Sequence, residues 1–216
     1  MRKNYKALIF DYDDTLVQTR EIRYRTIKRI YNEVLKDNIS DNEIDSAWGL
    51  PAEEFLLKIF GKFSNDINSL WEIYNNYKKF DQNRPHENAF KFIEKYYDII
   101  RFGILTSSSY KVVTNELYEM KVDQNLFFNI QGAEHTDVHK PNPEVFLPIF
   151  KLLSESRIEK SEILYIGDSP ADFHSSTKFG LNFIGIAHDE RHLRFFKQQN
   201  INFVKNFHEL ELLLNP

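Results

Sequence analysis

Three carboxylates follow the first apolar segment of the chain. Asp11, Asp13 and Asp14 come directly after residues 7–10, Ala-Leu-Ile-Phe. Like charges at this spacing repel one another, so they are stable together only if a cation neutralises them, if they share a proton, or if they are exposed to water. The segment therefore indicates a cation site, a site for acid and base chemistry, or an exposed acidic turn.

Two more carboxylates follow a later apolar segment. Asp168 and Asp172 come after residues 163–166, Ile-Leu-Tyr-Ile. If the two segments are neighbouring parallel strands, about 4.8 Å apart, Asp11, Asp168 and Asp172 converge on one site. Hard oxygen ligands without His or Cys favour Mg²⁺. For Asp172 the alternative is a structural role as the N-cap of the helix that follows.

Hydroxyl groups and a lysine lie between these two acidic segments. Thr106 and Ser107 follow the apolar residues 102–105, and Lys140 stands before two prolines that fix the start of a helix. Taken alone, the hydroxyl groups are explained equally well as helix N-caps. A lone lysine is usually a solvated surface charge.

The elements that carry these residues indicate an α/β fold. Apolar runs without polar alternation occupy residues 7–10, 102–105, 163–166 and 183–186, as in parallel strands that are buried on both faces. Weaker strand patterns occur at 128–130 and 202–204, and helical patterns separate most of these runs. We therefore predict a doubly wound parallel sheet covered by helices on both faces.

The segment between the first two strands differs from the rest of the chain. Helical patterns cover residues 19–36, 52–60 and 65–80, with no convincing strand among them. We predict an all-helical cap over residues 18–84, inserted into a core formed by residues 1–17 and 85–216. Pro85 is expected in the first turn of the next core helix.

Composition excludes several classes of protein. The 216 residues carry 28 basic and 32 acidic side chains, a net charge of −4, so the chain lacks the positive field that nucleic acids or membrane surfaces require. The absence of cysteine excludes disulfides, thiolate catalysis and Cys-type metal sites. No stretch approaches the roughly 20 apolar residues that span a bilayer. We expect a cytoplasmic monomer or weak homo-oligomer with a small soluble partner.

In this order and at these strand ends, the four segments resemble the motifs of the haloacid dehalogenase superfamily of phosphotransferases. The resemblance covers the core and, more loosely, the helical insertion. It implies a Rossmannoid core with a helical cap after the first strand, similar to phosphoglycolate phosphatases and β-phosphoglucomutase-like enzymes. Asp14 and Ser107 depart from the family pattern, in which Gly and Asn are frequent at these positions.

The resemblance implies a role for each of the polar residues. Asp11 is the nucleophile that forms an aspartyl-phosphate, and Asp13 is the general acid and base. Thr106, Ser107 and Lys140 bind the phosphoryl group of a small phosphorylated metabolite. Mg²⁺ is held by the carboxylates of Asp11, Asp13, Asp168 and Asp172.

Asp13 also separates the possible activities. The dehalogenase branch lacks an acid at this position, because cleavage of a carbon–halogen bond requires no protonated leaving oxygen. We therefore predict a phosphatase. A phosphomutase of the β-phosphoglucomutase type and a non-catalytic protein that binds phosphometabolites are the alternatives.

Within the predicted cap, residues 48–51, Trp-Gly-Leu-Pro, are similar to the loop that overhangs the active site in this family. Trp48 and Leu50 are the predicted substrate contacts, with packing of Trp48 against Trp71 as the alternative. The basic side chains at positions 20–29 are interpreted as the solvated face of an amphipathic helix, although they could attract an anionic substrate. Residues 189–197 are predicted to form a surface helix without chemistry.

Overall fold

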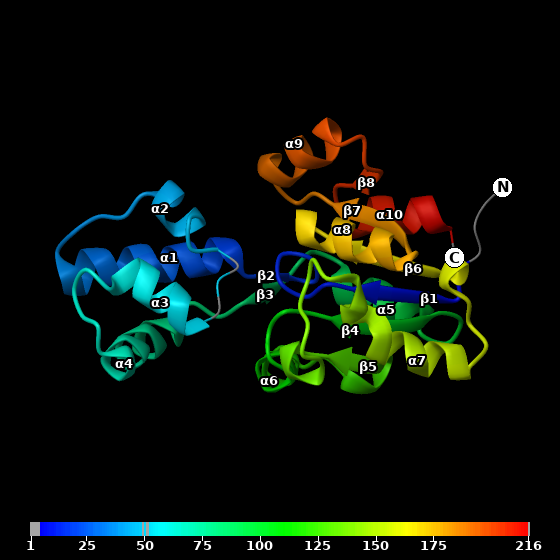
Figure 1. Ribbon diagram of the computed structural model, residues 1–216, viewed down its shortest axis with the longest axis horizontal. Helices are drawn as coiled ribbons and strands as arrows, with labels where there is room; N and C mark the ends of the chain where they lie inside the picture. Colours follow the sequence, from blue (N-terminus) through cyan, green and yellow to red (C-terminus); the bar gives the residue numbers. More distant parts are fainter. Residues whose placement is uncertain (1–4, 49, 51, 216) are drawn as a thin grey trace. The chain divides into compact units, whose positions relative to one another are not determined.

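The computed structural model describes residues 5–48, 50 and 52–215. The chain divides into two compact units, one formed by residues 1–18 and 84–216 and the other by residues 19–83 (Figure 1). The predicted cap, residues 18–84, differs from the second unit by one residue at each end. Below, the two units are called the core unit and the insertion.

The core unit contains a six-stranded parallel sheet, and the predicted α/β fold is confirmed. Its strand order is β5-β4-β1-β6-β7-β8, so the chain extends the sheet outward from β1 first on one side and then on the other. All four strong strand predictions correspond to strands, as do the two weaker ones. The strands are β1 (Ala7–Phe10), β4 (Arg101–Leu105), β5 (Phe127–Gln131), β6 (Ile163–Gly167), β7 (Asn182–Ile186) and β8 (Phe203–Val204).

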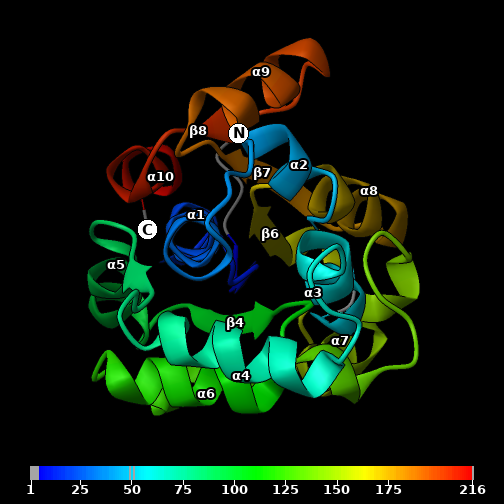
Figure 2. The same ribbon diagram turned by 90° about the vertical axis from the view of Figure 1, so that its left-hand side faces the viewer.

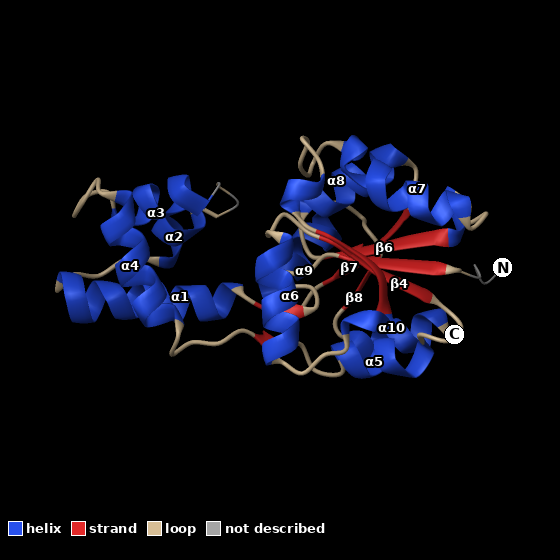
Figure 3. Cartoon of the chain, turned by 90° about the horizontal axis from the view of Figure 1, so that it is seen from below, coloured by secondary structure: helices blue, strands red, loops and turns tan. Residues whose placement is uncertain are grey.

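Helices cover both faces of this sheet, as Figure 3 shows. Alternate residues of a strand point to opposite faces, so Leu8 and Phe10 pack with α5, α6 and α10, whereas Ala7 and Ile9 pack with α7. Helices α5 and α10 lie next to each other on the first face (Figure 2). The helices of the core unit are α5 (Ala89–Tyr96), α6 (Tyr110–Glu119), α7 (Leu147–Glu155), α8 (Pro170–Phe179), α9 (Glu190–Gln198) and α10 (Phe207–Leu214).

A two-residue β-ladder joins the two segments of the core unit at the point where the chain enters and leaves the insertion. Strand β2 (Val17–Gln18) pairs antiparallel with β3 (Arg84–Pro85). The predicted position of Pro85 in the first turn of a helix is therefore wrong. The next helix, α5, begins only at Ala89, after Asn88 in the left-handed conformation with a φ of 62°. Pairing with Val17 holds Pro85 in the ladder instead.

The insertion is helical throughout its described elements and has its own apolar core. Helix α1 continues as a short π-helix over residues 31–35, which ends at Lys36 in the left-handed conformation. Ile27, Ile30, Leu56 and Leu70 are buried together. The α-helices are α1 (Arg20–Ile30), α2 (Asp41–Asp45), α3 (Ala52–Phe60) and α4 (Ile67–Lys78). Among the described residues of either unit, no helix has the length and apolar character needed to cross a membrane.

Candidate active site

Strands β1 and β6 are neighbours and bring the two acidic segments together. They pair in parallel, with Phe10 opposite Ile166, and the Asp11 N–H donates to the Ile166 carbonyl over 2.8 Å. These strands lie at the point where the direction of sheet growth reverses, and in doubly wound sheets ligands bind there, at the carboxyl ends of the strands. Asp11 and Asp168 thus follow adjacent strand ends.

The segment after β6 is built around Ser169 and Asp172. Ser169, not Asp172, is the N-cap of α8, and its hydroxyl accepts from the Asp172 N–H, while Asp172 accepts in return from the Ser169 N–H. Asp172 is therefore the third residue of a capping box. A Cβ at Gly167 would lie 2.5 Å from the Asp172 carboxyl carbon, so only glycine permits this approach.

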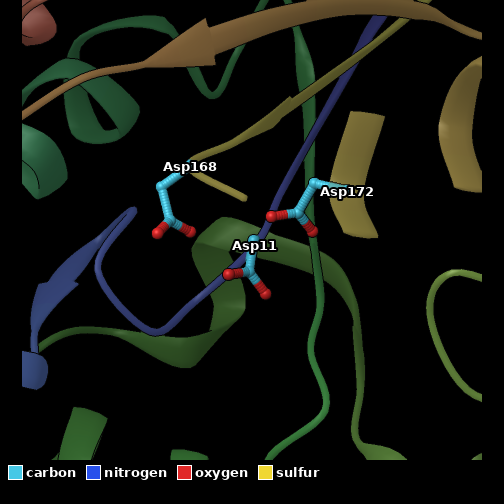
Figure 4. A group of neighbouring side chains, drawn as sticks. All are labelled: Asp11, Asp168 and Asp172. Carbon is cyan, nitrogen blue, oxygen red and sulfur yellow. The ribbon is translucent and has the colours of Figure 1, made fainter. Parts of the chain in front are cut away.

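Three buried carboxylates converge on one point, as Figure 4 shows. Asp11, Asp168 and Asp172 each offer an oxygen, and these oxygens all lie within 4.8 Å of one another. The three residues are 6%, 7% and 0% exposed, in that order. The three oxygens form a ligand set that a hard divalent cation would accept.

Lys140 places a buried positive charge between two of these acids. Its Nζ donates to Asp11 Oδ1 over 2.7 Å and to Asp172 Oδ1 over 2.6 Å, and its side chain is only 6% exposed. Burial alone would lower the pKa of Lys140, but the charges of Asp11 and Asp172 raise it well above its ordinary value. Lys140 is thus held in its charged form.

One lysine does not neutralise the site. Burial raises the pKa of Asp11 well above its ordinary value, and although Lys140 lowers it, the charges of Asp172, Asp168 and Asp13 raise it further. A second cation would offset this excess of negative charge, so the donor set fits a bound metal ion.

The hydrogen bonds distinguish the carboxylates of the cluster. Asp172 Oδ1 accepts from Lys140 and from the Tyr165 hydroxyl at 2.9 Å, and its Oδ2 accepts from the N–H and hydroxyl of Ser169. Both of its oxygens are therefore engaged twice. Asp11 meets one such donor, Lys140, and Asp168 meets two, Thr15 and His192, so both retain more capacity for a cation than Asp172 does.

The residues with hydroxyl side chains that follow β4 lie at the same edge of the sheet. Thr106 is buried, and its N–H donates to the Gln131 carbonyl over 3.0 Å. Its hydroxyl accepts from the N–H of Ser108, whose own hydroxyl donates to Asp13 Oδ2 over 2.6 Å. Ser107 is exposed. The sequence argument singled out Thr106 and Ser107 but missed the link from Ser108 to Asp13.

The predicted helix over residues 189–197 is present as α9, but the position of His192 in it was missed. His192 is buried, and its Nε2 lies 2.9 Å from Asp168 Oδ2. The predicted surface position is therefore wrong for this residue. A signal was present, because His192 and Phe196 occupy the i and i+4 positions of one helical face and both are buried.

In the insertion, the predicted substrate residues lie in different surroundings. Trp48 is partly buried and makes edge contacts with Tyr24 and Phe55, and the Arg20 guanidinium lies 4.6 Å above its ring. Trp71 contacts Tyr74 instead, and Leu50 is 39% exposed. Their contact with substrate stays a prediction, and residues 49 and 51 of the same loop lie outside the described residues.

Most of the basic side chains of α1 are paired with acids of the insertion. Lys28 binds Asp41, and Arg29 binds Asp81. Arg20 forms an ion pair with Asp45. Arg25 and Lys28 are exposed, as a solvated helix face requires, but Arg20 is buried, so that interpretation is wrong for Arg20.

Comparison with known proteins gives the same result as the geometry. A family model described as "Haloacid dehalogenase-like hydrolase" matches residues 8–186. The chain belongs to the haloacid dehalogenase-like hydrolase family. The match extends from β1 to the end of β7 and so includes both acidic segments and Lys140. The hydrolase is thus an enzyme of the phosphatase type that the motifs predicted.

Individual relatives support this assignment. The hydrolase is 30% identical over 162 residues to "Putative phosphatase YhcW" of Bacillus subtilis, covering 71% of this chain and 72% of that one. It is 25% identical over 205 residues to "Putative pyrophosphatase PpaX" of Clostridium perfringens, covering 92% and 91% of the two chains. In fold it is similar to the B. subtilis hydrolase YfnB, whose structure is described as bound to magnesium, with a TM-score of 0.79, 18% identity and coverage of 99% and 100%.

Proposed function

We propose that this hydrolase is a Mg²⁺-dependent phosphatase that cleaves a small phosphorylated substrate through an aspartyl-phosphate on Asp11. The observation that carries the proposal is the position of Asp11, which accepts from the buried Lys140 and lies beside Asp168 and Asp172. A buried carboxylate with an adjacent positive charge can approach a phosphate dianion without prohibitive repulsion. Asp13, held by Ser108, supplies the acid and base.

The reaction divides into two displacements. In the first, an Asp11 oxygen forms a bond to phosphorus, the bond to the leaving oxygen breaks, and Asp13 gives that oxygen its proton. In the second, water attacks the phosphorus, Asp13 takes a proton from the water, and the bond between Asp11 and phosphorus breaks. Lys140 stabilises the negative charge of the phosphoryl group in both steps.

Asp11 and Asp168 would hold the cation, whereas Asp13, also predicted as a ligand, is not among the three converging carboxylates and serves the proton transfers instead. Bound Mg²⁺ would neutralise the charge of the carboxylates and of the phosphate oxygens. Asp172 lies within reach of the same point, but its hydrogen bonds favour a different task, which is to hold Lys140 and the start of α8. The four predicted metal ligands therefore do not all have the same role.

The relatives suggest which substrates should be tested. Several are named pyrophosphatases, among them "Pyrophosphatase PpaX" of Listeria monocytogenes, 24% identical over 184 residues. One similar structure is described as a "putative beta-phosphoglucomutase from Thermotoga maritima". Inorganic pyrophosphate is therefore the first compound for a substrate panel, and β-hexose 1-phosphates test the mutase alternative.

The experiment measures phosphate release from this panel with Mg²⁺ and with a chelator. We expect release by the parent chain only with Mg²⁺, and a loss of about 10⁴-fold or more in Asp11→Asn, because no nucleophile remains. Asp98→Asn makes the same change at an exposed carboxylate of the core unit and should not alter the rate. Undiminished release by Asp11→Asn would exclude the covalent mechanism, and isomerisation of a hexose phosphate without release would indicate a mutase.

A further inference from the structure

The carboxylate of Asp168 is held on both sides by residues outside the acidic segments. The Thr15 hydroxyl donates to its Oδ1 over 3.3 Å, and His192 Nε2 lies 2.9 Å from its Oδ2. The side chains of Asp168 and His192 are only 9% and 7% exposed. Water therefore has little access to this pair, and the histidine is the donor that Oδ2 meets.

Asp189 holds the histidine in turn. It is the N-cap of α9, where its Oδ1 accepts from the N–H groups of Arg191 and His192, and the same oxygen lies 3.1 Å from His192 Nδ1. The start of α9 thus fixes a line of three groups, Asp189, His192 and Asp168. The Arg191 guanidinium lies beside this line, with Nη2 2.8 Å from His192 Nε2.

The charges around the ring favour its role as a donor. Burial alone would lower the pKa of His192, but Asp168 and Asp189 raise it to about 9. Arg191 and His192 together balance the charges of these two carboxylates. Carboxylate oxygens only accept, so the short distances from Nε2 to Asp168 and from Nδ1 to Asp189 both place a proton on the ring nitrogen.

We propose that His192, held by Asp189, is a positioning residue that fixes the Asp168 carboxylate in the orientation in which it binds the catalytic cation. The inference rests on the proposed function, in which Asp168 is a ligand of that cation. The terminal torsion of an aspartate is soft, so a carboxylate turns unless its oxygens are hydrogen-bonded. Partners of this kind behind a metal ligand typically contribute about 10-fold to 100-fold to metal affinity or activity.

A purely structural role would have different consequences. His192 could serve only to attach α9 to the sheet, and its loss would then lower stability without changing the affinity for a cation. The two roles are separated by His192→Gln, whose side-chain amide places a neutral donor near the position of Nε2, and by His192→Leu, which keeps bulk but donates nothing.

The test measures the dissociation constant of Mn²⁺, as a substitute for Mg²⁺, in the metal-free full chain without substrate, by the electron paramagnetic resonance signal of free Mn²⁺. We expect His192→Leu to raise the dissociation constant by about 10-fold to 100-fold and His192→Gln by about threefold at most. His208→Leu, at an exposed histidine of α10, serves as the matched control and should bind as the parent does.

The Mn²⁺ affinities of the variants distinguish the positioning role of His192 from a purely structural one. Equal binding by the parent and His192→Leu, or equally weakened binding by the Leu and Gln variants, overturns the positioning role and leaves the proposed function intact. No binding by the parent overturns both. If His192→Leu does not fold, Asp189→Asn carries the test, because asparagine keeps the N-cap while it removes the charge behind His192. Unchanged Mn²⁺ affinity in that variant would overturn the inference.

Discussion

Each unit of the molecule contains a buried ionic cluster, and the two clusters are built in opposite ways. In the core unit a cation, Lys140, lies between the carboxylates of Asp11 and Asp172. In the insertion a carboxylate, Asp81, is 5% exposed and accepts from the Thr26 hydroxyl over 3.0 Å. Its other partner is Arg29, with an N–O distance of 3.2 Å.

The clusters differ in their balance of charge. Asp81 has a full cationic partner in Arg29, and Arg25 lies at 4.0 Å, so the insertion neutralises its buried acid with its own residues. The core cluster contains more acids than cations, and burial together with the charges of the neighbouring acids raises the pKa of Asp11. Buried charge that the chain leaves uncompensated has a stability cost, and its retention at a strand end indicates a ligand.

The strongest test of this contrast removes the core cation. In Lys140→Met we expect the rate of phosphate release to fall by about 10³-fold, because the phosphoryl charge loses its fixed counter-charge. The measurement is kcat and KM at saturating Mg²⁺. Lys160→Met is the matched control, since Lys160 bonds the Phe179 carbonyl and lies over the Phe179 ring, away from the acids. A Lys140→Met enzyme as active as the control would show that the excess charge serves another purpose.

The corresponding change in the insertion should affect stability instead of chemistry. Asp81→Asn removes the buried negative charge that pairs with Arg29. We expect the free energy of unfolding to fall by about 1–3 kcal/mol, which is less than for a fully buried ion pair because Arg29 is partly exposed. Both tryptophans of the chain, Trp48 and Trp71, belong to the insertion, so tryptophan fluorescence during urea unfolding follows this unit. Glu72→Gln, at an exposed site on α4, is the control.

The value of kcat completes that test. Because the contacts of Asp81 lie within the insertion, kcat at a temperature where Asp81→Asn is folded should stay within about twofold of the parent. A loss of kcat comparable to that of Lys140→Met would mean that the two clusters do not differ in the way proposed.

The parts of this molecule that sequence predicted are those that local pattern determines. Uniform apolar runs marked the strands, and the acids after residues 10 and 166 marked the strand ends, so the convergence of Asp11 and Asp168 required only that β1 and β6 be neighbours. The family resemblance then supplied roles for these positions. The pairing of β1 with β6 was the long-range contact that this prediction assumed.

The parts that were missed depend on contacts between distant segments. Pro85 was placed in a helix because its pairing with Val17, on the other side of the insertion, has no local signature. Ser108 follows Thr106 and Ser107 in a run of hydroxyl residues, and only the fold brings it to Asp13. His192 lies in a charged helix whose composition suggested solvent, although its spacing to Phe196 indicated a buried face.

A pair of histidines in the core unit differs from both clusters because it is buried without charge. The rings of His86 and His188 stack with their centroids 3.4 Å apart, and both side chains are partly buried. Burial, followed by the charges of His188 and His192, lowers the pKa of His86 from 6.5 to about 3. The acid cluster offsets part of its charge with Lys140, whereas this histidine pair carries no charge at neutral pH.

Acid should therefore destabilise the core unit through His86. Between pH 6.5 and 3 the unfolded chain binds a proton at His86 that the folded chain does not, so stability falls as the pH is lowered through this range. His86→Phe keeps a stacked ring that cannot be protonated. Relative to that variant, the parent should lose about 1–2 kcal/mol of unfolding free energy between pH 7 and pH 5, followed by circular dichroism in urea. His208→Phe, at an exposed histidine, should show no such change, and a constant difference between parent and His86→Phe would show that the folded pair accepts the proton.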